Sequence, residues 1–251
     1  MNSENKAIRI LGVVIFSVGV LLGTALFAAI VWADFEASMF DLNMRGTASL
    51  KTLRCPVMMT ATEAGTVRAT FANPLERPVE FMIRAHISDG YVTLMREINS
   101  TLSVAPGETK PLEWPVAPDD AAYGRLILVR VRVGARYPLP SRHASCGILV
   151  LGLPCLTGNL IFALAFAASL LSMVVGAGLW IRANRPLREL GLDVTRAMGA
   201  LAGCVVIGTV VGLLGWWVFG VIILVITLLL AGAIIGYFVN RRQVVTSSVV
   251  G

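Results

Sequence analysis

The chain has 251 residues, of which 56% are hydrophobic and 14% are charged, and its formal net charge at pH 7 is +6. Soluble domains carry about 25% charged residues, so this composition excludes a single soluble globular domain. The sequence also lacks the dense Lys/Arg face with interleaved aromatic residues that is typical of nucleic-acid-binding proteins. We therefore expect an integral membrane protein that binds the lipid bilayer and no nucleic acid.

The first stretch without Asp, Glu, Lys or Arg covers residues 10–33. It suits one transmembrane helix, since a span needs about 20 apolar residues, and residues 1–9 then form a cytoplasmic N-terminus. A cleaved signal peptide is the alternative, because Ala33 is small enough for a signal peptidase. The apolar run is longer than the roughly 7–15 residues of a signal-peptide core, so we predict an uncleaved anchor.

Residues 34–152 replace the long apolar runs with short alternating ones. Residues 65–71, 79–87 and 126–133 alternate, and turn signals such as Asp89-Gly90 separate these runs. About seven or eight short strands of this kind indicate an antiparallel β-sandwich. The predicted fold class is an α+β membrane protein with four transmembrane helices and one extracytoplasmic antiparallel β-sandwich.

A local motif narrows the type of sandwich. The run from Asp119 to Tyr123 reads Asp-Asp-Ala-Ala-Tyr and directly precedes the strand predicted at 126–133. It resembles the tyrosine corner of immunoglobulin-like and fibronectin-III-like domains, and the resemblance implies that the Tyr123 hydroxyl bonds to upstream backbone. Arg125 stands where antibody-type domains carry a cysteine, so the inter-sheet disulfide of those domains is absent.

The predicted topology places two of the four cysteines in the outer domain and two in or beside the membrane spans. Cys55 and Cys146 lie near the beginning and the end of the outer domain, where an oxidising compartment would let them form a disulfide. Closing a loop of roughly 90 residues stabilises a fold by about 4–5 kcal/mol in the chain-entropy model. Cys155 and Cys204 lie in or beside spans, and we expect them to be small packing residues.

Two further stretches without charged residues, 143–181 and 197–240, contain the remaining spans. The former is too long for one helix and contains Pro154, so its first part reads better as a strand. The latter fits two spans and a tight turn. The predicted segments are transmembrane helices at 158–181, 197–215 and 218–240, a cytoplasmic Arg-rich loop at 182–196, and a cytoplasmic C-terminus at 241–251.

Charge gives the orientation. Residues 34–142 contain 13 basic and 12 acidic residues, whereas the rest of the chain contains 8 basic and 3 acidic ones. Four spans put all eight of those basic residues on one side, and the positive-inside rule makes that side the cytoplasm. We therefore predict a multi-pass cell-membrane protein with cytoplasmic termini and a periplasmic or extracellular domain.

No catalytic, cofactor-binding or metal-binding motif stands out. His86, His143, Cys146 and Met58 offer the ligand types of a blue-copper site. Their spacing does not match the usual cysteine, histidine, methionine loop, and Cys146 has a better use in a disulfide. The spans also lack the ionisable side chains that pumps and proton-coupled carriers use. We therefore expect neither an enzyme nor a bound cofactor.

Two features indicate possible partner surfaces. Arg84 and His86 point the same way along one predicted strand, as do Arg130 and Arg132 along another. If these strands are neighbours, we favour an ordinary exposed sheet face balanced by Glu80, and a basic patch that binds a partner is the alternative. Glycines four residues apart line single helix faces and allow close helix packing, either within the bundle or against another subunit. These pairs are Gly19 and Gly23, Gly199 and Gly203, Gly208 and Gly212, and Gly232 and Gly236.

These observations favour a non-enzymatic accessory or structural subunit of a membrane complex, with a membrane protein as its partner. One alternative is a membrane-anchored ligand-binding, adhesion or receptor module. The other is a non-catalytic component of a transporter.

Overall fold

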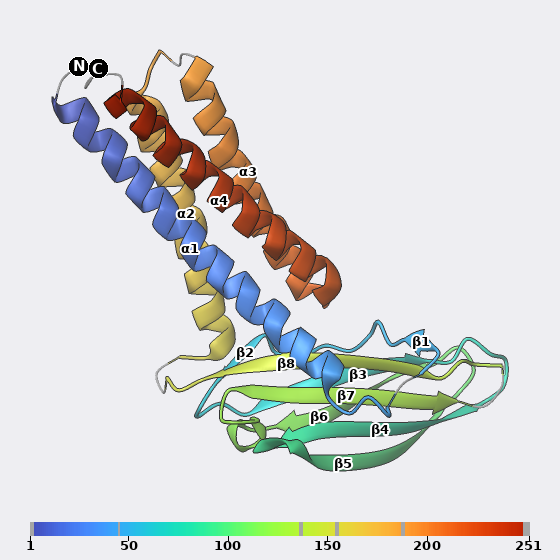
Figure 1. Cartoon of the computed structure of the whole chain (residues 1–251). Helices are drawn as coiled ribbons and strands as arrows, with labels where there is room; N and C mark the ends of the chain where they lie inside the picture. The colour runs from blue at the N-terminus through green and yellow to red at the C-terminus, as the bar shows by residue number, and fades with distance from the viewer. Residues whose placement is uncertain (1–2, 45, 136–137, 154–155, 187–188, 248–251) are drawn as a thin grey trace. The chain divides into compact units, whose positions relative to one another are not determined.

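The computed structural model describes residues 3–44, 46–135, 138–153, 156–186 and 189–247 (Figure 1). The chain forms two compact units, one of residues 1–28 and 164–251 and the other of residues 29–163. We call them the helix unit and the β unit and describe each by itself. Cys155 lies outside the described residues.

The described part of the β unit contains two sheets. One is a six-stranded mixed sheet in the order β1-β8-β7-β4-β5, with β2 also paired to β8, and the other pairs β3 with β6 (Figure 1). The strands are β1 (Ala48–Ser49), β2 (Met58–Thr60), β3 (Gly65–Ala72), β4 (Val79–Asp89), β5 (Tyr91–Val104), β6 (Thr109–Val116), β7 (Leu126–Ala135) and β8 (Arg142–Leu151).

One hydrophobic core joins the two sheets. Ile127, Val129, Val131 and Val133 of β7 are buried in it, and so is Trp114 of β6. Successive side chains of a strand point to opposite faces, so the alternation predicted at 126–133 is confirmed. The opposite face of the larger sheet does not contribute to this core.

The expectation of a wholly antiparallel sheet is wrong at one edge. β1 and β2 both pair with β8 in parallel. These strands are two and three residues long, too short to show a period in sequence. In addition, residues 91–104 form one long strand, β5, which pairs with β4 along nearly its whole length.

A disulfide joins Cys55 to Cys146, which confirms the predicted pair. Cys146 lies in β8, opposite Val129 of β7. Cys55 follows Arg54, whose backbone makes both hydrogen bonds of a bridge to Arg68 of β3. The disulfide therefore ties the β3–β6 pair to the larger sheet.

Within the described residues, four helices are long and apolar enough to cross a membrane. They are α1 (Ser3–Met39), α2 (Gly158–Ala183), α3 (Glu189–Leu213) and α4 (Trp217–Ser247). Three of them differ from expectation, and one is α4, which continues to Ser247 although its span was predicted to end at 240. α1 runs six residues past the predicted end at Ala33, and α3 begins inside the predicted Arg-rich loop.

The helix unit uses some of the predicted glycines for close packing. A side chain on Gly19 would meet Ser169 and Met173 of α2, and the Ser169 hydroxyl donates a hydrogen bond to the Gly19 carbonyl at 2.7 Å. Gly23 lies against Ser169 and Val205 of α3, while Gly208 lies against the ring of Phe27. These contacts leave no room for a larger residue at the three positions.

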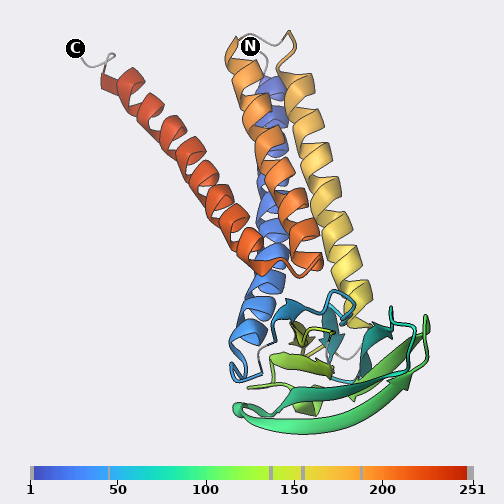
Figure 2. The ribbon, with the colours of Figure 1, turned by 90° about the vertical axis from the view of Figure 1, so that its right-hand side faces the viewer.

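Other glycines of the set face open space. A side chain added to Gly199, Gly203, Gly232 or Gly236 would meet no atom of the described chain within 4 Å. Gly212 is buried. In the helix unit, α4 contacts α3, and Figure 2 shows the two helices diverging from the turn that joins them.

Replacing both Cys55 and Cys146 by serine is expected to destabilise the β unit by about 2–5 kcal/mol, because the unfolded chain regains the entropy of a long loop. Thermal unfolding in detergent, with and without reductant, measures the loss. Cys204→Ser is the matched control, since this cysteine is free. Equal melting temperatures for all three proteins would contradict a stabilising role.

Candidate functional site: the helix–sheet junction

The last turns of α1 lie directly on the larger sheet of the β unit. Gly147 of β8 is in such close contact with the Ala33 backbone that a side chain there would collide with the Ala33 carbonyl. The Gly147 amide donates a hydrogen bond to the Asp34 carboxylate at 3.2 Å. Ala37 and Phe40 pack with apolar residues on the same face, so this helix end covers part of the sheet opposite the core.

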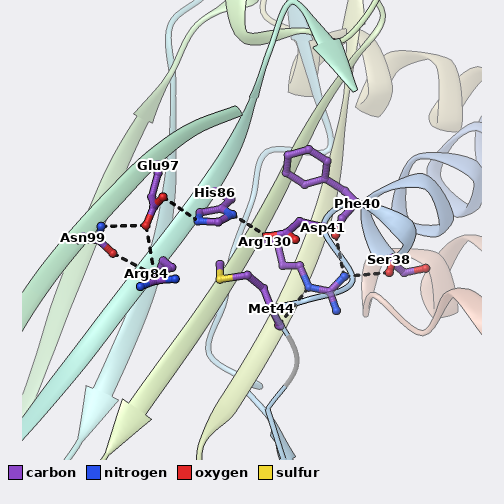
Figure 3. A network of polar contacts seen from close by, with 9 residues as sticks. All are labelled: Ser38, Phe40, Asp41, Met44, Arg84, His86, Glu97, Asn99 and Arg130. Carbon is purple, nitrogen blue, oxygen red and sulfur yellow. Dashed lines mark hydrogen bonds and ion pairs between the residues drawn. The ribbon is translucent and has the colours of Figure 1, made fainter. Parts of the chain in front are cut away.

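The end of α1 is fixed by a buried arginine. Arg130 of β7 is 4% exposed. Its Nη1 donates to the carbonyls of Ser38 at 3.0 Å and Phe40 at 2.8 Å, and its Nε donates to that of Met44 at 3.2 Å (Figure 3). Carbonyls at a helix C-terminus lack partners and carry partial negative charge, so a guanidinium there satisfies them while they compensate its burial.

Asp41 lies in the turn that follows α1 and makes the second contact. Its φ is +42°, the left-handed region, which Asp and Asn tolerate better than most residues. Its Oδ2 lies 2.7 Å from His86 Nδ1 of β4, and both side chains are more than nine-tenths buried (Figure 3). This pair holds the turn 40–44 against the sheet, beside the Arg130 contacts.

The network continues to the exposed edge of the sheet. His86 Nε2 is 3.8 Å from Glu97 Oε2 of β5, and Arg84 Nε is 3.3 Å from Glu97 Oε1. The Asn99 amide donates a hydrogen bond to Glu97 at 2.9 Å. That bond, followed by the Arg84 charge, lowers the pKa of Glu97, so its carboxylate stays ionised at neutral pH beside the imidazole.

The structure brings the four residues of the possible basic patch together but does not expose them all. Its strands are neighbours, since Arg84 pairs with Arg132 and His86 with Arg130 in register. However, Arg130 and His86 are buried, so the four residues do not form one exposed basic surface. The covering segment 34–44 is the reason, because its contact with the sheet could not be read from the strands alone.

The predicted tyrosine corner is also wrong. Tyr123 is 67% exposed, and in the described residues its hydroxyl has no hydrogen-bond partner. Its backbone amide instead donates to the Gly90 carbonyl at 2.9 Å. The carboxylate near Asp119 that stabilises this region belongs to Asp120, which accepts hydrogen bonds from the Ala117 amide at 2.8 Å and from Arg96 at 2.9 Å.

The alternative blue-copper ligands do not come together. Cys146 is in the disulfide, and His143 Nδ1 accepts a hydrogen bond from the Gly46 amide. His86 pairs with Asp41. The part of the chain that the structure describes holds no group of three or more His, Cys, Asp or Glu side chains arranged for a metal ion.

A second helix is anchored in the β unit by a carboxylate that sequence reasoning missed. Glu63 Oε2 accepts hydrogen bonds from the amides of Gly158 at 2.7 Å and Thr60 at 3.3 Å. Gly158 is the first residue of α2 and lies in close contact with the backbone of Met58 and Met59. A negative charge suits the start of a helix, so Glu63 fixes α2 beside β2.

Comparison with known proteins adds no family. No family model matches the chain, and no curated protein matches it. Among solved structures, Bacteroides uniformis beta-glucuronidase 2 is 15% identical over 38% of this chain and 12% of that chain, with a TM-score of 0.30. Listeria innocua beta-glucosidase is 18% identical over 44% and 17% of the two chains, with a TM-score of 0.30.

The CARDB domain of a Pyrococcus furiosus protein, in complex with di-metal ions, is 13% identical over 42% of this chain and 94% of that domain, with a TM-score of 0.31. The present chain thus spans less than a fifth of either glycosidase. At these TM-scores the likenesses carry no argument about fold or activity.

Arg130→Met is expected to destabilise the junction by about 2–4 kcal/mol, because buried carbonyls at the end of α1 lose their donor. Thermal unfolding in detergent and amide hydrogen exchange over residues 38–44 measure the effect. Arg132→Met on the same strand is the control, since Arg132 is exposed. Equal exchange in the two variants would show that Arg130 does not hold the helix end.

Gly147→Ala is expected to cost about 1–3 kcal/mol, because the added methyl group overpacks the contact with α1. Gly134→Ala on β7 is the matched control, since a side chain there meets its neighbours at ordinary distances of 3.6 Å or more. Melting temperatures of the two variants, compared with the parent, test the contact. A loss that is equal at both glycines would contradict it.

Proposed function

We propose that the chain is a non-enzymatic integral membrane protein that serves as an accessory or structural subunit of a membrane complex. Its four apolar helices lie in the bilayer with both termini in the cytoplasm. Its β unit is an immunoglobulin-like sandwich held on the periplasmic or extracellular side, where it is presented to a partner.

The observation that carries this proposal is the helix–sheet junction. α1 is continuous from Ser3 to Met39, and its last turns are fixed to the sheet by Arg130 and the contact at Gly147. Glu63 similarly anchors the first residue of α2. A β unit that packs on the ends of two apolar helices is suited to presenting a surface to a partner.

Three observations support the location and the sandwich. The disulfide Cys55–Cys146 favours an oxidising compartment. Nearly all net positive charge lies outside residues 34–142, which favours a non-cytoplasmic β unit. The shared core between the six-stranded and the two-stranded sheet is the arrangement that two packed layers require.

The open glycines support docking in the membrane. Gly232 and Gly236 lie four residues apart on α4 and meet no described atom. Helices in lipid associate through small residues that let backbones approach. A transmembrane helix of a partner subunit is the ligand that this face of α4 suits.

Purification from native membranes in mild detergent, followed by native mass spectrometry, tests the proposal. A membrane protein in stoichiometric amount is expected, and Gly232→Leu with Gly236→Leu should remove it by preventing close approach. Gly178→Leu on α2 is the control, since this glycine also has open surroundings. Recovery of a lone monomer from native membranes would contradict an accessory role.

A further inference from the structure

A hollow of about 340 Å³ opens in the β unit between the end of α1 and the strands beside it. Trp32 and Glu36 of α1 line one side, one helical turn apart and therefore on the same helix face. Tyr123 and Arg125 line the other side, and Val92 and Leu128 are among its apolar walls. Its volume falls in the range of about 300–1,000 Å³ that small-molecule sites occupy.

The hollow contains two charges of opposite sign that serve no other contact. Glu36 and Arg125 both line it, and among the described residues neither side chain makes an ion pair or a hydrogen bond. Some other charged side chains of the β unit do have partners, as Arg96 has in Asp120. The hollow is therefore complementary to a ligand that carries both a negative and a positive group.

Aromatic side chains stand at its rim. Trp32 is 58% exposed and Tyr123 is 67% exposed, and Tyr123 packs edge-on against Tyr91 with ring centroids 5.9 Å apart. The φ of Tyr123 is +53°, and strained residues of this kind persist where surrounding structure fixes them, often at ligand clamps. The bond from its amide to Gly90 supplies that constraint.

We infer that this hollow binds the headgroup of a zwitterionic phospholipid. The guanidinium of Arg125 suits the phosphate, because Arg recognises phosphate oxygens with paired donors. The carboxylate of Glu36 and the rings of Trp32 and Tyr123 suit the ammonium group, through charge and cation–π attraction. An anionic phospholipid such as phosphatidylglycerol lacks the ammonium group and leaves the Glu36 carboxylate without a cationic partner.

The position along the chain agrees with this occupant. Trp32 lies among the last residues of the predicted span at 10–33, where Trp and Tyr prefer the boundary between hydrocarbon and water. Glu36 follows one turn later, at the level expected for headgroups. In this respect the inference rests on the proposed function, since it requires α1 to lie in a bilayer.

Native mass spectrometry of the full chain tests the site, after purification in detergent with equal amounts of palmitoyl-oleoyl-phosphatidylethanolamine and palmitoyl-oleoyl-phosphatidylglycerol. One phosphatidylethanolamine is expected to remain bound in preference to phosphatidylglycerol. Arg125→Gln and Glu36→Gln should each lower its occupancy by about five- to tenfold, as expected when a charge-assisted contact is lost.

Matched controls are Arg132→Gln and Glu80→Gln, because both residues are exposed and neither lines the hollow. Unchanged occupancy in these two, with loss in the other two, supports the site. Equal retention of both lipids, or equal occupancy in all four variants, overturns it.

A separate arm distinguishes failure of the site from failure of the proposed function. Extraction of membranes with alkaline carbonate tests whether the chain is embedded; release of the chain would overturn the proposed function. The thermal shift produced by water-soluble glycerophosphoethanolamine needs no bilayer. A shift that Arg125→Gln abolishes supports the site even then, and no shift in the parent overturns it.

Discussion

The buried guanidinium of Arg130 is the interaction on which the arrangement of the β unit depends. A charge that is 4% exposed is costly unless hydrogen bonds compensate it, and the carbonyls at a helix end are costly unless donors satisfy them. At the end of α1, the guanidinium donates hydrogen bonds to these carbonyls, so each group satisfies the other. The junction therefore has one position in which both are satisfied, and Asp41, His86 and Gly147 take their places around it.

Much of the β unit follows from sequence, and the junction does not. The alternation of Ile127, Val129, Val131 and Val133 predicts a strand with one buried face, and the positions of Cys55 and Cys146 predict a disulfide. Nothing local in Arg130 tells whether it is buried, since its partners lie about ninety residues earlier in the chain. The same holds for β1 and β2, whose pairing depends on β8 rather than on their own pattern.

The helices show a similar division. Length and the absence of charge predict four apolar helices, yet the end of α1 was misplaced because Asp34 and Glu36 read as the start of a soluble domain. In the structure these two residues are helical, and each faces a different part of the β unit. Asp34 accepts a hydrogen bond from β8, whereas Glu36 lines the hollow. The first charged residues after the apolar run therefore mark where α1 begins to contact the β unit, and the helix itself continues beyond them.

The parallel pairing of β1 and β2 with β8 bears on how the chain is made. β8 is the last strand of the sheet to leave the ribosome, yet β1, β2, the disulfide and the helix contact at Gly147 all require it. Contacts between distant residues form slowly, because the intervening loop must be ordered first. The β unit therefore completes only when residues 142–151 arrive, so its assembly is tied to the synthesis of α2, which follows at once.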